Sequence, residues 1–174
     1  EDHVGEDRAE LDVERLLRTA VHAGTGDVRG QQIGRELDAG KRSTDRLGKR
    51  LDRQGLGQPG HALDPATTVG AVVDQRQLDN VLRYISIGRE QGAELIAGGQ
   101  RTLEETGGLY VQPALFDGVT NAMTIAQEEI FGPVLSLITF DTVEEALQIA
   151  NDSIFGLAAG VWTSNLSKAH TFAR

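Results

Sequence analysis

The sequence predicts an α/β fold in which a mainly parallel sheet is layered with helices. Two observations carry this prediction. After Leu63, apolar runs of strand length alternate with amphipathic helical segments, and this order is typical of parallel strands joined by helical connections. Before Leu63 neither pattern is sustained. The fold is therefore predicted for residues 63–174, and residues 1–62 form an atypical segment.

This first segment also differs in composition from the rest of the chain. All eight aromatic residues lie at or after Tyr84, whereas the segment before Leu63 holds 11 of the 17 Lys and Arg. One modest helical pattern covers residues 9–23, and in residues 24–60 isolated Leu residues stand among Gly, Arg, Asp and Gln. Such a stretch buries too little apolar surface to offset the entropy lost on ordering. We expect it to be weakly ordered, or helical only in pieces.

The first clear element is a helix from Asp74 to near Gly92. Asp74 and Gln77 have the spacing of a capping box, in which each side chain caps the backbone N–H of the other residue. Apolar residues then recur at helical spacing and predict one buried face. This face consists of Leu78, Val81, Leu82 and Ile85.

Strand-like segments follow the helix. Glu94–Ala97 is a short strand candidate before two glycines, and residues 110–119 are predicted to be extended. Pro113 lacks a backbone N–H, which favours an edge or irregular strand there. Val134–Phe140 is a continuous apolar run, typical of a strand that is buried on both faces.

The C-terminal part continues the alternation. Residues 142–150 have the spacing of an amphipathic helix with one apolar face. Residues 157–163 are a second candidate for a buried strand, and a further helix is predicted to begin at Leu166.

Composition and charge exclude several classes of protein. The net charge of −9 argues against a nucleic-acid binder, because phosphate contacts need clustered Lys and Arg. No stretch approaches the ~20 apolar residues of a membrane span, and no secretory signal is visible, so the cytoplasm is the expected location. The four His residues show no ligand spacing, so no metal site is predicted. Cysteine is absent, which excludes disulfides and a thiol nucleophile in this chain.

The segment with the clearest chemistry is residues 128–134, Glu-Glu-Ile-Phe-Gly-Pro-Val. Gly132 permits unusual backbone angles and Pro133 fixes φ, so the loop can hold Glu129 and Phe131 in defined places. A carboxylate accepts hydrogen bonds from a ribose diol, and an aromatic face packs against a flat heterocycle. On local features alone, a solvated Glu pair and a core Phe is the more frequent arrangement of such a loop.

The wider pattern resembles the aldehyde dehydrogenase superfamily. Residues 129–133 are similar to its Glu-Ile-Phe-Gly-Pro motif, and three further segments resemble the family in order and spacing: residues 58–70, 110–115 and 151–163. Several ordered motifs are far more specific than one. The resemblance covers residues 63–174 and is strongest to the γ-glutamylaminobutyraldehyde and related aminoaldehyde branch.

The resemblance implies part of a catalytic α/β domain that oxidises aldehydes to carboxylic acids with NAD or NADP, in an intact parent that is a homo-oligomer. By the same resemblance, Glu129 would hydrogen-bond the nicotinamide-side ribose and Phe131 would pack near the nicotinamide. The family's nucleophile is a Cys thiolate, and this chain has no Cys. We therefore expect the chain to be inactive. The alternative is a non-catalytic binding or assembly module from a decayed paralogue.

The missing Cys suggests a hypothesis about the first segment: residues upstream of about Gly57 are a frameshifted translation. Residues 28–31, Val-Arg-Gly-Gln, can be encoded GTG-CGC-GGG-CAG. Read one base later, these codons give Cys-Ala-Gly, as around the family's nucleophile. The low aromatic content of residues 1–62 also suits an alternative reading frame of a GC-rich gene.

Overall fold

The computed structural model describes residues 31–36, 56–156, 159–161, 163 and 165–173. In chain order the elements are β1 (Gln31–Glu36), α3 (Gln75–Glu90), β2 (Glu94–Ala97), β3 (Arg101–Thr102), a 3-10 turn (Glu104–Thr106), β4 (Tyr110–Val111), β5 (Ala114–Asp117), α4 (Thr124–Gln127), β6 (Val134–Phe140), α5 (Val143–Asn151) and α6 (Leu166–Phe172). The predicted α/β class is confirmed.

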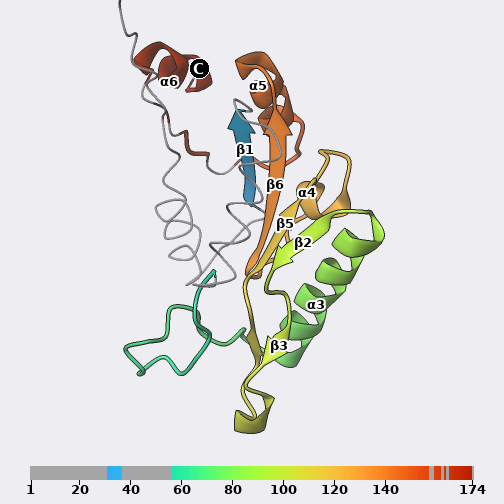
Figure 1. Cartoon of the computed structure of the whole chain (residues 1–174), viewed down its shortest axis with the longest axis vertical. Helices are drawn as coiled ribbons and strands as arrows, with labels where there is room; N and C mark the ends of the chain where they lie inside the picture. The colour runs from blue at the N-terminus through green and yellow to red at the C-terminus, as the bar shows by residue number, and fades with distance from the viewer. Residues whose placement is uncertain (1–30, 37–55, 157–158, 162, 164, 174) are drawn as a thin grey trace, which may run out of the picture.

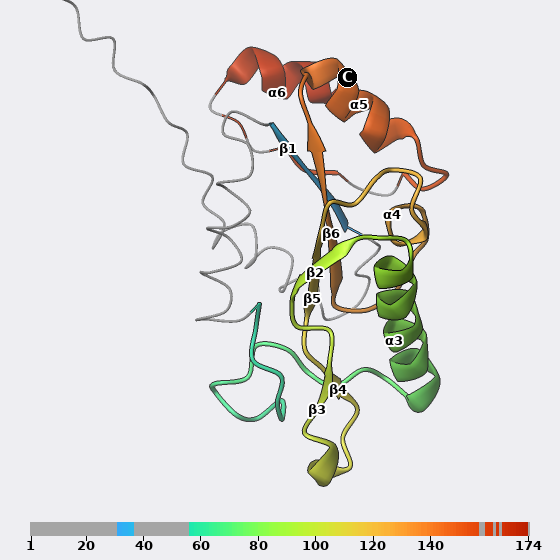
Figure 2. The same ribbon diagram turned by 45° about the vertical axis from the view of Figure 1, so that its right-hand side comes forward.

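The main sheet has four strands in the order β1-β6-β5-β2. β6 pairs in parallel with both β1 and β5, whereas β2 pairs antiparallel with β5. Figure 1 shows α3 running beside the β5–β2 half of this sheet, and Figure 2 shows α3 and α4 on one face of it. β3 and β4 form a separate two-stranded sheet at the end opposite α5 and α6 (Figure 2). The layered, mainly parallel sheet is confirmed.

The core lies between α3 and the sheet. It joins the buried face of α3 to alternate residues of β5 and β6, and its fully buried members include Leu78, Val81, Phe116 and Ile125. Burying one such side chain stabilises the fold by about 1.5–3 kcal/mol. On the opposite face of the sheet, a smaller hydrophobic cluster consists of Leu56, Leu115, Leu135 and Leu137. β6 is thus buried on both faces, as its continuous apolar run predicts.

The first turn of α3 confirms half of the predicted capping box. The Asp74 carboxylate accepts a hydrogen bond from the Gln77 backbone N–H at 2.7 Å. The reciprocal bond is replaced, because the Gln77 side chain donates to the carbonyls of Ile130 and Phe131 instead. The predicted buried face is present and also includes Tyr84.

β1 is a strand within residues 1–62 that the sequence did not predict. Gln31–Glu36 forms a strand that pairs in parallel with β6, from Gln31 opposite Leu135 to Glu36 opposite Phe140. Its single large apolar residue, Ile33, produces no alternation in the sequence. The backbone pairing comes from a strand distant in the sequence, which periodicity cannot reveal. The other residues of the segment up to 55 lie outside the described part.

The extended stretch at residues 110–119 is split at Pro113 into β4 and β5. Of the two predicted alternatives, an edge strand or an irregular one, the irregular strand is found, since β5 lies between β6 and β2. The chain accommodates Pro113 by placing it before the strand, where no ladder bond needs its missing N–H.

The C-terminal helices are confirmed with their caps. Thr142 accepts from the Glu145 N–H at the start of α5, and Asn165 accepts from the Lys168 N–H at the start of α6. The strand predicted at 157–163 is not found, since the described residues 159–161 and 163 form no strand and the others lie outside the description.

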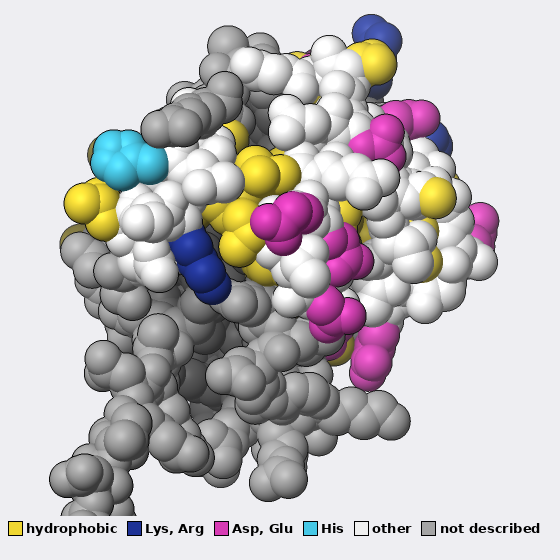
Figure 3. Space-filling view, turned by 90° about the horizontal axis from the view of Figure 1, so that it is seen from above, with side chains coloured by type: hydrophobic (Ala, Val, Ile, Leu, Met, Phe, Trp, Pro, Cys, Tyr) yellow, Lys and Arg dark blue, Asp and Glu magenta, His cyan; other side chains and the backbone are white. Residues whose placement is uncertain are grey.

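The end of the molecule that carries α5 and α6 exposes apolar side chains. Ile154 is 93% exposed and Leu166 is 71% exposed, and α6 has no buried residue. Figure 3 looks onto this end and shows hydrophobic side chains beside acidic ones. None of the helices in the described ranges combines the length and apolarity needed to cross a membrane.

Candidate functional site

Residues 128–133 form the loop between α4 and β6, and backbone hydrogen bonds tie it down at both ends. The Glu128 N–H donates to the Thr124 carbonyl at 2.9 Å, which closes α4. The Val134 N–H donates to the Gly132 carbonyl at 2.8 Å, so the chain turns tightly at Pro133, and the Pro133 carbonyl accepts from the Ala114 N–H of β5 at 2.7 Å. The loop is therefore anchored to the sheet where β6 begins.

Phe131 has a strained backbone within this loop. Its φ is +53°, in the left-handed region that bulky residues rarely adopt. A non-glycine residue held in such a region costs on the order of 1–3 kcal/mol, and such residues cluster at functional sites. Phe131 is 50% exposed as a residue and is not part of the core. An exposed aromatic residue held in a strained conformation favours a binding role.

Gly132 contributes differently from the prediction. Its φ is outside the left-handed region that favours glycine, so unusual backbone angles are not its role. Instead, a Cβ added at Gly132 would overlap Cγ2 of Val81 on α3. The glycine lets the loop lie directly against α3. The residue with the unusual dihedral is its neighbour, Phe131.

The two carboxylates of the loop lie in different surroundings. Glu128 is exposed and accepts a hydrogen bond from the Tyr84 hydroxyl at 2.6 Å. This bond, followed by burial, raises the pKa of Tyr84 above its ordinary value of 10.0. Glu129 is partly exposed, and one of its oxygens, Oε1, is buried. The structure thus places Glu129 and Phe131 on one short loop beside α3.

Two residues of this site were missed in the sequence, Gln77 and Asn80. The Gln77 side-chain amide donates to the Ile130 carbonyl at 2.9 Å and to the Phe131 carbonyl at 2.6 Å. The Asn80 amide donates to the Ile130 carbonyl at 3.3 Å. The capping-box spacing accounted for Gln77 locally, so no signal in the sequence pointed to a contact with so distant a segment.

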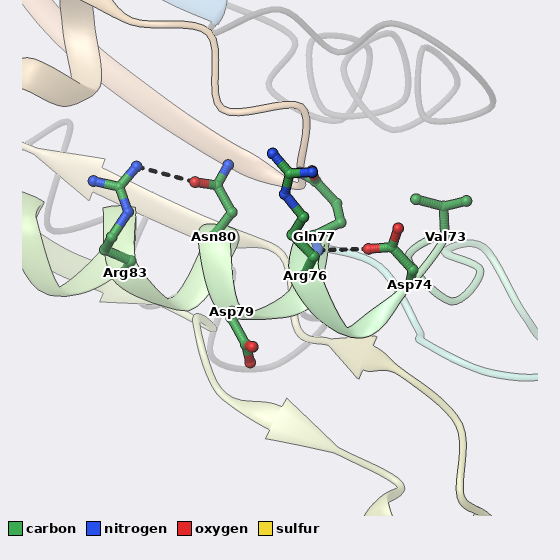
Figure 4. A pocket seen from close by; sticks show the side chains of 7 residues that line it. All are labelled: Val73, Asp74, Arg76, Gln77, Asp79, Asn80 and Arg83. Atoms are coloured by element: carbon green, nitrogen blue, oxygen red, sulfur yellow. Dashed lines mark hydrogen bonds between the residues drawn. The ribbon is translucent and has the colours of Figure 1, made fainter.

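A pocket of about 520 Å³ lies along the first two turns of α3. It is lined by Val73, Asp74, Arg76, Gln77, Asp79, Asn80 and Arg83. Figure 4 shows Arg76, Asn80 and Arg83 on one side of the helix and Asp79 on the other. Glu129 and Phe131 do not line this pocket, which borders their loop only through Gln77 and Asn80. Among the described residues, no three His, Asp or Glu side chains form a group able to hold a metal ion.

Comparison with known proteins identifies the family. The family model described as "Aldehyde dehydrogenase family" matches residues 39–174. The chain belongs to the aldehyde dehydrogenase family. The match begins upstream of Leu63, so it includes part of the segment that the sequence sets apart. The division at residue 62 stays a prediction.

Curated relatives of this aldehyde dehydrogenase chain are much longer than it is. An aldehyde dehydrogenase of Deinococcus radiodurans is 50% identical over 119 residues, covering 66% of this chain and 22% of the relative. A betaine aldehyde dehydrogenase of Cereibacter sphaeroides is 47% identical over 125 residues, covering 72% of this chain and 25% of the relative. The chain thus spans about a quarter of the length of these proteins.

Solved aldehyde dehydrogenases share its fold. An indole-3-acetaldehyde dehydrogenase in complex with NAD⁺ superposes with a TM-score of 0.80 and 51% identity, covering 94% of this chain and 33% of that one. An NAD⁺ complex of a Bacillus cereus aldehyde dehydrogenase gives a TM-score of 0.79 and 36% identity, covering 93% and 33%.

Proposed function

We propose that this chain is part of the catalytic domain of an NAD(P)-dependent aldehyde dehydrogenase, whose intact form oxidises aldehydes to carboxylic acids. The family membership and the NAD⁺ complexes among its relatives support this proposal. The γ-glutamylaminobutyraldehyde branch, a cytoplasmic location and a homo-oligomeric parent belong to the same proposal. It assigns the aldehyde dehydrogenase part to residues 63–174.

In this proposal the loop at residues 128–133 meets the nicotinamide end of the cofactor. The observation that carries it is that Phe131 is half-exposed and held in a strained conformation, two positions after Glu129. The residues fit a nicotinamide ribose, because a carboxylate accepts hydrogen bonds from ribose hydroxyls and an aromatic face packs on a flat ring. When bound, the nicotinamide would supply a hydride acceptor. Glu129 and Phe131 would hold and orient it.

The chain as it stands is proposed to be inactive. Aldehyde oxidation of this kind needs a nucleophile that forms a covalent intermediate with the substrate. The thiol that the resemblance assigns to this role is absent, since the sequence includes no Cys. The hypothesis of a frameshift upstream of about Gly57 explains that absence. The family match begins at residue 39 and so overlaps the end of the stretch that the hypothesis concerns.

Nicotinamide mononucleotide tests the cofactor role, because it carries the nicotinamide and its ribose 5′-phosphate without the adenosine half of NAD. In saturation-transfer NMR the wild-type chain is expected to bind it, and Glu129→Gln or Phe131→Ala to weaken binding about tenfold. Glu144→Gln and Phe155→Ala are matched controls, since both side chains are exposed on the α5 end. Absence of binding, or equal loss in the controls, contradicts the role. The same sample with NAD⁺ and an aldehyde is expected to form no NADH.

A second candidate is a non-catalytic module that assembles with another chain. The exposed Ile154 and Leu166 favour it, because exposed apolar groups of this size mark surfaces that pack against other atoms. Co-purification with an intact aldehyde dehydrogenase, together with failure to bind the mononucleotide, would favour this candidate over the first.

A further inference from the structure

One face of α3 carries three polar side chains that all contact the loop at residues 128–133. Gln77, Asn80 and Tyr84 stand three and four positions apart, the spacing that brings residues to the same face of a helix. Each donates a hydrogen bond to the loop. Gly132 lies against the same face at Val81. Helix and loop thus meet through direct packing and a row of donors.

Gln77 makes the shortest contact with the loop backbone. Its amide nitrogen donates to the Ile130 carbonyl at 2.9 Å and to the Phe131 carbonyl at 2.6 Å. A side-chain amide nitrogen has two hydrogens, so both are used here. The two carbonyls belong to the peptide bond that enters Phe131 and the one that leaves it. Fixing both carbonyls restricts the backbone angles of Phe131 itself.

Arg83, on the same side of the helix as Asn80, contacts the other two donors. Its guanidinium donates to Asn80 Oδ1 at 3.0 Å, which leaves the Asn80 amide nitrogen to donate to the Ile130 carbonyl. The same guanidinium stacks on the Tyr84 ring, 4.3 Å from its centre. Tyr84 in turn donates to the Glu128 carboxylate. The loop is therefore held at Glu128, before Glu129, as well as at Ile130 and Phe131.

We infer that Gln77 is a positioning residue, which together with Asn80 and Tyr84 holds Phe131 in its left-handed conformation and so presents the loop to a nicotinamide nucleotide. The inference rests on the proposed function for its purpose, but not for its geometry. Two of the three donors bind backbone carbonyls, so they fix the path of the chain between Glu129 and Gly132. Without these hydrogen bonds, the backbone of Phe131 is freer to relax from its strained φ.

The test is cleavage by chymotrypsin after Phe131 in the full chain without cofactor, followed by mass spectrometry. Cleavage after Phe155, a Phe 40% exposed, is the internal reference. Gln77→Ala removes two hydrogen bonds and is expected to raise the relative cleavage rate after Phe131 about tenfold. Gln75→Ala is the matched control, because Gln75 lies on the same turn and bonds only Asp79 among the described contacts. It is expected to leave the ratio unchanged.

Gln77→Glu separates hydrogen bonding from packing. It keeps the size of the side chain and replaces the donor nitrogen by an oxygen, so it is expected to act like Gln77→Ala. A Gln77→Glu chain that is cleaved like wild type, or a control that matches Gln77→Ala, overturns the inference. The melting temperature is expected to fall by only about 3–6 °C, since a tenfold effect corresponds to about 1.4 kcal/mol of lost hydrogen bonding.

The binding assay keeps the two proposals apart. If Gln77→Ala raises cleavage after Phe131 but neither the wild-type chain nor any variant binds nicotinamide mononucleotide, the positioning role stands and the cofactor role fails. If the mononucleotide binds and Gln77→Ala changes neither cleavage nor affinity, the cofactor role stands and the positioning role fails. When both hold, Gln77→Ala weakens mononucleotide binding by about the factor by which cleavage rises.

Discussion

The two helices α3 and α6 are held in place by different forces. α3 has five buried residues and packs against β5 and β6, whereas α6 has none. α6 is only seven residues long, and isolated helices of that length are marginal in water. Its described support is local, chiefly the Asn165 cap. The α3 helix is therefore held by a packed hydrophobic core. The α6 helix has no buried residue to hold it in the same way.

The first prediction compares one Leu from each helix, and it carries the largest expected effect. Leu78 on α3 is 0% exposed and Leu166 on α6 is 71% exposed. Leu78→Ala is expected to lower the free energy of unfolding by about 2–5 kcal/mol, through lost burial and the cavity it leaves. Leu166→Ala is expected to change it by less than about 0.5 kcal/mol. Urea unfolding followed by circular dichroism measures both.

A large loss from Leu166→Ala would break the comparison. It would mean that the α6 end is covered in solution by atoms outside the described residues or by another copy of the chain. Repeating the measurement at several protein concentrations distinguishes these cases, because only association between chains makes the unfolding midpoint depend on concentration.

The second prediction sharpens the comparison with two glycines. A Cβ at Gly132 would overlap Val81, and a Cβ at Gly156, near α5, would meet nothing within 4 Å. Gly132→Ala is expected to destabilise the fold by about 1–3 kcal/mol through overpacking. Gly156→Ala is expected to be neutral or stabilising by up to about 1 kcal/mol, since it restricts the unfolded chain. Thermal unfolding measures both variants. Equal losses of stability in the two would contradict the packing argument.

The sequence predicts well those elements whose pattern is produced by burial. α3 shows a helical period because one face meets the core, and β6 shows a continuous apolar run because both of its faces are buried. Glu94–Ala97 is followed by two glycines. α5 is also found, through its amphipathic spacing, and a helix is present from Leu166 as predicted. In each case the information lies close together along the chain.

What sequence reasoning missed depends on contacts between distant residues. β1 owes its pairing to β6, and Gln77 donates to carbonyls 53 and 54 positions away. The strain at Phe131 and the close approach of Gly132 to Val81 are set by the same helix–loop contact. The motif at residues 129–133 marks the candidate site, and the polar face of α3 that contacts it has no local signature in the sequence.

The last prediction uses pH to probe the helix–loop contact at Tyr84. Its hydrogen bond to Glu128 and its burial raise the pKa of its hydroxyl above 10.0. The folded chain therefore favours the neutral hydroxyl, and this contribution to stability is fully present below the unfolded pKa of about 10. It is lost as pH rises through the higher folded pKa.

At neutral pH, Tyr84→Phe is expected to cost about 1 kcal/mol, the net value of one hydrogen bond. Urea unfolding at rising pH should show this difference from wild type shrinking above pH about 10, because ionised Tyr84 would face the Glu128 carboxylate. Glu128→Gln removes that charge and should lower the pKa of Tyr84, which absorbance of the tyrosinate records. Parallel stability curves for wild type and Tyr84→Phe across this range would show that the bond does not hold the loop to α3.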